Sequence, residues 1–187
     1  ERIKNLPLPM EARATLIASL VVPKAVYACA VNWPSESSLT KLRAQCTTAV
    51  WGQGNHWRAP EVVMTLLAKG HIADPVQAAA YQTITVASRV LRKQPELEQL
   101  FYEVLQRRRA SRATHKGPGH AFIRALKNAH LDLNVENGCL AHRRVDLRNE
   151  EVPLLPWLQM SIPKLQHEIR EAQRHEQWVR LAARRNS

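Results

Sequence analysis

Apolar residues recur every three to four positions along much of the chain, which is the spacing of one buried face of an α-helix. In the first part of the sequence this spacing holds over Leu16–Val21, is interrupted at Pro23, and resumes at Lys24. Proline lacks a backbone N–H and collides with the carbonyl four residues earlier, so it ends or kinks a helix. The pattern predicts one helix from Pro9 to about Val22 and a second from Lys24 to about Val31.

Residues that start and stop helices divide the rest of the chain. Ser35 or Ser37 caps the next apolar run, Asp74 precedes Pro75 as a cap precedes the first helical residue, and Gly70 follows a run as a stop. The helices predicted in this way run from Ser35 or Ser37 to about 50 and over about 60–69, 75–92, 95–109, 121–129 and 162–184.

One segment alternates with period 2 instead. Leu131, Leu133 and Val135 alternate with polar residues, and Asn137-Gly138 follows, as in a two-residue hairpin turn. The predicted fold is therefore an all-α bundle of about seven helices, with or without a small β-hairpin near Leu131–Cys139.

The segment Arg107–Gly119 separates two parts of the chain. It has five basic residues, no acidic residue and a Gly-Pro-Gly end, a composition typical of linkers. It predicts a helical bundle over 1–106, a basic linker over 107–119 and a C-terminal helical extension over 120–187. The alternative is a helical array with two lobes divided at Gly117-Pro118-Gly119.

Composition agrees with a helical, folded chain. Of 187 residues, 45% are hydrophobic, which argues against wholesale disorder, and only six are glycine, which argues against a turn-rich β-fold. The apolar runs are far shorter than the ~20 residues of a membrane span, and no signal peptide is recognisable. We expect a soluble intracellular protein, and a start at Glu1 without methionine favours a fragment or a processed product.

The net charge gives the clearest indication of the kind of partner. Lys and Arg number 27 against 16 Asp and Glu, giving a formal charge of +11. Such a chain attracts polyanions, with nucleic acid first and an acidic membrane surface or protein second. The alternative is a basic surface that is merely solvated.

Two groups of residues fit a nucleic-acid contact. His56-Trp57-Arg58 places a cation beside an aromatic residue in a glycine-containing loop, where Trp57 either stacks on a base or fills the core between helices. The basic residues of 107–116 either neutralise several phosphates or form a solvated linker.

The sequence offers no catalytic site. It has no nucleotide-binding glycine loop, no metalloprotease or hydrolase motif, and no aspartate pair placed to hold two magnesium ions. Its three cysteines fit buried thiols, and Cys139-x-x-His142 is only half of a zinc motif. We predict no catalytic residue, no metal and no cofactor.

Three stretches in order resemble one protein family. LPLPMEARATLIASLVVPKAVYACAVNW, SSLTKLRAQCTTAVWG and APEVVMTLLAKGHIADPVQAAAY resemble the region after the catalytic palm in reverse transcriptases of non-LTR (LINE-type) retrotransposons. The similarity covers roughly the first half of the chain, and the C-terminal part is similar more loosely. The residues that carry it are Leu6, Pro7, Pro23, Lys24, Tyr27, Leu39, Leu42, Arg43, Trp51, Gly52, Pro60, Glu61, Gly70, His71, Asp74 and Pro75.

This resemblance implies a polymerase thumb, a helical bundle that contacts the template–primer duplex, with Pro23 as a bend between two short helices. It also implies a palm and fingers domain as partner and a nuclear location. The palm's metal-binding aspartates are missing from this chain, so polymerisation is not carried over to it. The predicted nucleic-acid-binding residues, which would contact the phosphate backbone of an RNA/DNA duplex, are Lys24, Arg43, His56, Trp57, Arg58, Lys69, Arg107, Arg108, Arg109, Arg112 and Lys116.

Three functions of different class follow. The first is a reverse-transcriptase thumb and C-terminal fragment that is non-catalytic alone. The second is a basic helical module that serves as a structural subunit and binds RNA or protein in a larger assembly. The third is an unrelated enzyme whose site the sequence does not reveal.

Overall fold

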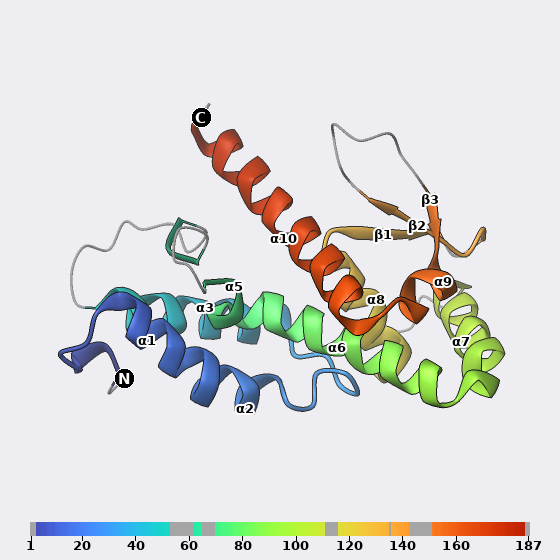
Figure 1. The fold of residues 1–187 in the computed structure, drawn as a ribbon, viewed down its shortest axis with the longest axis horizontal. Helices are drawn as coiled ribbons and strands as arrows, with labels where there is room; N and C mark the ends of the chain where they lie inside the picture. The colour runs from blue at the N-terminus through green and yellow to red at the C-terminus, as the bar shows by residue number, and fades with distance from the viewer. Residues whose placement is uncertain are drawn as a thin grey trace. The chain divides into compact units, whose positions relative to one another are not determined.

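Helices make up most of the computed structural model, which describes residues 3–52, 62–64, 70–110, 116–134, 136–142 and 151–185 (Figure 1). A small antiparallel sheet of three strands accompanies them. The chain forms two compact units. Unit 1 contains the described residues within 1–27, 34–79 and 176–187, and unit 2 those within 28–33 and 80–175. The predicted helical class is confirmed, and the sheet adds to it.

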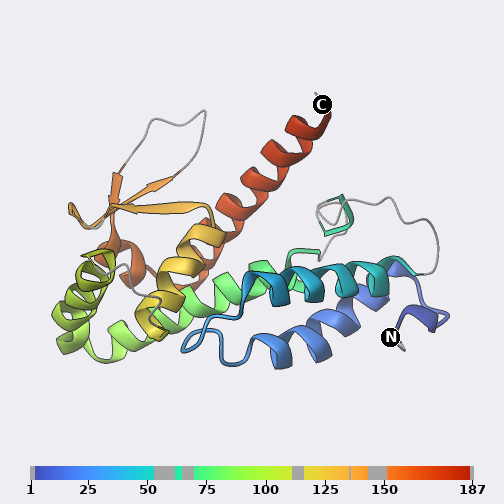
Figure 2. The same cartoon turned by 180° about the vertical axis from the view of Figure 1, so that it is seen from behind.

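Unit 1 is built on an N-terminal run of helix that packs against a second helix. The run consists of α1 (Met10–Leu16), a π-helical turn η2 (Ile17–Val21) and α2 (Val22–Val26), and it is preceded by a short 3-10 turn η1 (Ile3–Asn5). Helix α3 (Glu36–Trp51) lies beside α1, as the blue and cyan ribbons of Figure 2 show. Their apolar faces form the core of this unit, including Ala14, Ile17, Val22, Val26, Leu39, Cys46 and Val50.

The predicted break at Pro23 takes a different form. The chain stays helical through Pro23, which lies in the first turn of α2, and the irregularity precedes it as the π-turn. There the N–H of Val22 bonds to the carbonyl of Ile17, five residues back. This wider turn suits a proline that cannot donate an α-helical bond. The second helix is also shorter than predicted, because α2 ends at Val26 and residues 27–31 form a turn.

Of the two residues predicted to cap α3, Ser35 and Ser37, one is confirmed. Ser35 is the cap, since its hydroxyl accepts a 3.1 Å hydrogen bond from the Ser38 N–H. The helix ends at Gly52, whose φ of +92° lies in the region that glycine favours. Gly70, predicted as a stop, is instead the first residue of the short helix α5 (Gly70–Ala73).

Unit 2 surrounds its own core. After η3 (Pro95–Leu97) come α7 (Glu98–Ala110) and α8 (Pro118–Asn128), and then β1 (Leu131–Asn134) and β2 (Cys139–His142). The rings of Phe101 and Phe122 meet edge to face with centroids 5.1 Å apart. The largest buried side chains of this unit are Ile84, Leu105, Phe122, Leu126, Leu131, Leu140, Leu154, Trp157, Leu158 and Leu165.

The hairpin prediction is confirmed and extended. β1 and β2 pair antiparallel with Asn134 opposite Cys139, so the connection is longer than the predicted two-residue turn, and its described residues, 136–138, form a turn. A third strand, β3 (Glu151–Pro153), joins β2, and α9 (Leu154–Gln159) follows it directly. The sequence did not predict β3, because three residues are too few to show an alternating pattern. It did not predict α9 either, because Pro156 argues against a helix, although the first turn of a helix tolerates proline.

Two long helices contribute residues to both units. They are α6 (Pro75–Lys93) and α10 (Ile162–Arg185), close to their predicted bounds. The predicted linker begins inside a helix, because α7 continues to Ala110, and α7 and α8 on either side of it pack together. The division into 1–106, 107–119 and 120–187 stays a prediction.

Candidate nucleic-acid interface

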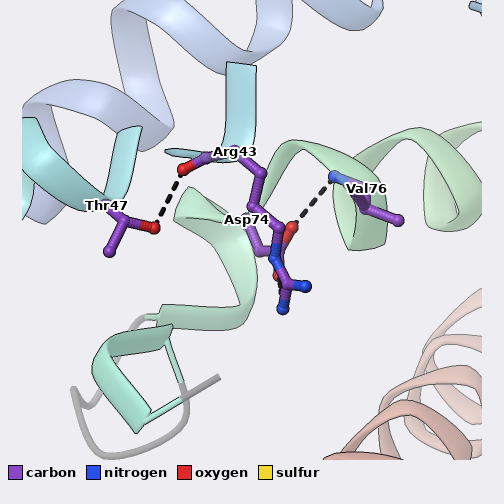
Figure 3. A network of polar contacts seen from close by, with 4 residues as sticks. All are labelled: Arg43, Thr47, Asp74 and Val76. Carbon is purple, nitrogen blue, oxygen red and sulfur yellow. Dashed lines mark hydrogen bonds and ion pairs between the residues drawn. The ribbon is translucent and has the colours of Figure 1, made fainter. Parts of the chain in front are cut away.

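Arg43 is the predicted site residue with the best-defined surroundings (Figure 3). It lies on α3, and its Nη2 is 2.8 Å from Oδ2 of Asp74. The side chain of Asp74 is fully buried and that of Arg43 is 16% exposed. Thr47, one turn later on α3, donates a 2.8 Å hydrogen bond to the Arg43 carbonyl. The guanidinium therefore points toward a partner within the chain, and its predicted contact with nucleic acid stays a prediction.

Asp74 performs two tasks in unit 1. Its Oδ1 accepts a 3.0 Å hydrogen bond from the Val76 N–H at the start of α6, which confirms the predicted cap before Pro75. Its Oδ2 is the partner of Arg43. Burial raises the pKa of Asp74, while Arg43 and the backbone N–H groups of Val76 and Gln77 oppose the rise. The carboxylate thus joins α3 to the first turn of α6.

Lys24 is placed differently from Arg43. It is exposed on α2, in the turn after the π-helical segment. Its side chain is exposed at the surface of unit 1, whereas the guanidinium of Arg43 is paired with the buried Asp74.

The second predicted basic group lies in unit 2. Arg107 is on the last turns of α7, with 82% of its side chain exposed, and its Nη2 is 3.5 Å from Glu103 Oε2. An exposed pair of this kind contributes little stability. Arg108 and Arg109 belong to α7 by their backbone, and Lys116 is exposed just before Gly117. The predicted residues outside the described part of the chain are His56, Trp57, Arg58, Lys69 and Arg112.

No model of a protein family, no curated protein and no solved structure matches this chain.

Metal ligands do not gather in the residues that the structure describes: no group of three or more His, Cys, Asp or Glu side chains there could hold an ion. Cys139 lies in β2, half-buried, at the start of the half zinc motif.

None of the described helices is long and apolar enough to cross a membrane.

Tyr27 is highly exposed, although it is not among the predicted site residues. It follows α2, and 81% of its surface is exposed, more than for any other large hydrophobic residue among those described. Its exposure depends on the π-turn, which shifts the buried series by one residue. Ile17 and Val22 are both buried although they lie five positions apart, which agrees with that shift.

Further cations lie on the surface of unit 2. Arg89, Arg92 and Lys93 are exposed near the end of α6, and Lys164 and Arg170 are exposed on α10. The carbon of the Arg170 guanidinium lies 5.6 Å from the centre of the Tyr81 ring, which holds that side chain in place. These residues add positive charge to the same unit that carries Arg107 and Lys116.

Proposed function

We propose that this chain is the thumb and C-terminal region of a reverse transcriptase of the non-LTR retrotransposon type. In this role it is non-catalytic alone and contacts the phosphate backbone of a template–primer duplex. The palm and fingers of the parent protein would be its covalent partner, and the location would be nuclear.

The Arg43–Asp74 ion pair is the observation that carries this proposal. Arg43 belongs to the second stretch that resembles the family and Asp74 to the third, and the two side chains meet in the interior of unit 1. Gly52, also in the second stretch, ends α3 with a positive φ. Residues that carry the resemblance therefore hold α3 and α6 together, as expected if the three stretches are parts of one inherited fold.

The surface charge supports a contact with phosphates. Lys24 in unit 1 and Arg107 and Lys116 in unit 2 are exposed on a chain with a formal charge of +11. Contacts of Lys and Arg with phosphates position a protein on a duplex without reading its bases. Binding should therefore be independent of sequence and should weaken steeply with salt.

The test measures affinity for an RNA–DNA duplex between ~50 and ~200 mM salt. We expect a linear fall of the logarithm of the binding constant with the logarithm of salt concentration. Lys24→Ala and Arg107→Ala should each lower the slope by about 1 and weaken duplexes of different sequence alike. Glu96→Gln is the control: it changes the net charge at an exposed residue by +1, whereas each alanine variant changes it by −1, and it should leave the slope unchanged.

A flat salt response in the wild-type chain would contradict the proposal. The function left would then be the structural subunit that binds protein in a larger assembly. Unchanged slopes in both alanine variants, beside a steep wild-type slope, would place the contact elsewhere on the chain.

A further inference from the structure

The π-turn determines which residues of the N-terminal helix face outward. Ile17 and Val22 are both buried although five positions apart, and Val26 continues the buried side four residues later. Because the turn brings Val22 and Val26 into the core, Lys24 and Tyr27 are left on the exposed side. Single π-turns inside helices are rare and frequently occur at functional sites.

Lys24 and Tyr27 form a pair with complementary properties. They are three residues apart, and Tyr27 keeps helical angles (φ −50°, ψ −43°), so the two side chains are neighbours on one face. Lys24 is exposed and Tyr27 is 81% exposed. The pair offers one cation and one accessible aromatic ring, about one helical turn apart.

The net charge of the chain argues for the kind of partner this pair contacts. Lys24 is the only charged residue between Arg13 and Glu36 in the sequence, and the whole chain has a formal charge of +11. A second copy of the chain is a poor occupant, because both copies carry +11 and repel each other. A cation beside an exposed aromatic ring, on a chain with this net charge, matches a nucleic-acid strand, whose phosphates and bases those two groups can contact.

We propose that Tyr27 stacks on an unpaired base at the end of the duplex while Lys24 contacts the adjoining phosphate. This inference rests on the proposed function and specifies it further, because a paired base inside the duplex offers no free face to Tyr27. The surface therefore recognises a junction between duplex and single strand.

The experiment compares three ligands at one salt concentration: a blunt RNA–DNA duplex, the same duplex with a short unpaired thymidine extension, and that duplex with the extension made abasic. Stacking on an aromatic residue should make the thymidine extension bind about fivefold to 100-fold more tightly than the abasic one. Tyr27→Ala should abolish this preference and Tyr27→Phe should keep it. Val90→Ala removes side-chain bulk from another exposed apolar residue, 42% exposed on α6, and should change nothing.

The outcomes separate the two proposals. If the wild-type chain binds all three ligands equally, or if Tyr27→Ala retains the preference, the inference is wrong while duplex binding stands. If the wild-type chain binds none of them, the proposed function fails and the inference with it. The far-UV circular dichroism spectrum of Tyr27→Ala should match that of the wild type, because the replaced ring is exposed. A loss of helical signal would instead indicate a structural role for Tyr27.

Discussion

Nη2 of Arg43 lies 2.8 Å from Oδ2 of Asp74, and the aspartate side chain is fully buried while that of the arginine is 16% exposed. The pair links the middle of α3 to the first turn of α6, 31 residues further along the chain. Removing one partner of a buried pair leaves the other charge without compensation, which costs about 3–5 kcal/mol. The link is therefore expected to be essential to unit 1.

Asp74→Asn tests the charge separately from the cap, because an asparagine oxygen can still accept from the Val76 N–H. We expect a loss of about 3 kcal/mol in the free energy of unfolding, at the low end of the range because Arg43 keeps some access to water. Urea denaturation followed by circular dichroism measures it. Glu96→Gln, at an exposed carboxylate, is the control and should stay within about 0.5 kcal/mol. Equal stability of both variants would show that the ion pair does not hold the unit together.

Alanine substitutions of two valines test the position of the π-turn. Val26 is 2% exposed and Val31 is 62% exposed, although they lie only five residues apart. Val26→Ala removes two buried carbon groups and should cost about 2 kcal/mol, while Val31→Ala should cost less than about 0.5 kcal/mol. The same denaturation experiment compares them. Similar costs, or the reverse order, would mean that the helix after Ile17 faces the core in a different register.

Features that depend on a few neighbouring residues could be predicted from the sequence. Ser35 as a cap and Asp74 before Pro75 as the start of α6 are decided by bonds that reach only two or three residues. The hairpin at 131–142 was also visible, because its alternation and its Asn137-Gly138 turn are local.

Features decided by distant contacts could not be predicted. The π-turn places Ile17 and Val22 both in the core although they are five residues apart, and an α-helical spacing gives no sign of this until the packing is known. The pairing of Arg43 with Asp74 could not be predicted either, because the two residues lie 31 positions apart in the sequence. β3 is likewise defined only by its pairing with β2.

A substitution of Gly138, in the hairpin turn, should lower the free energy of unfolding. It has a φ of +62°, and a Cβ there would overlap the hydroxyl of Tyr102 from α7. Gly138→Ala must therefore adopt a left-handed conformation and displace Tyr102, and we expect a loss of about 2–4 kcal/mol. Thermal unfolding of the two proteins measures the difference.

A matched background separates the two costs at Gly138. In a chain that already carries Tyr102→Ala the overlap is gone, so Gly138→Ala should cost only the conformational part, about 1–2 kcal/mol. If the cost is the same in both backgrounds, Tyr102 does not pack over the hairpin turn.

The last prediction concerns stability in alkali. Burial, and to a smaller extent the nearby Asp74 carboxylate, together raise the pKa of Cys46 on α3 from an ordinary value of 9.0 to about 11. The folded chain therefore holds the thiol proton more tightly than the unfolded chain does. The stability that this proton contributes is complete below pH 9 and is lost as the pH rises through 11. A difference of this size corresponds to at most about 2.7 kcal/mol.

Cys46→Ala should accordingly flatten the fall in the free energy of unfolding between pH 9 and pH 11, whatever constant offset the smaller side chain adds at every pH. Cys29→Ala should flatten it too, because burial also raises the pKa of that thiol. Cys139→Ala replaces a thiol that is only half-buried and is the control. The measurement is urea denaturation at a series of pH values. If wild type and Cys46→Ala lose stability in parallel across that range, the thiol of Cys46 is not the group that must stay protonated in the core of unit 1.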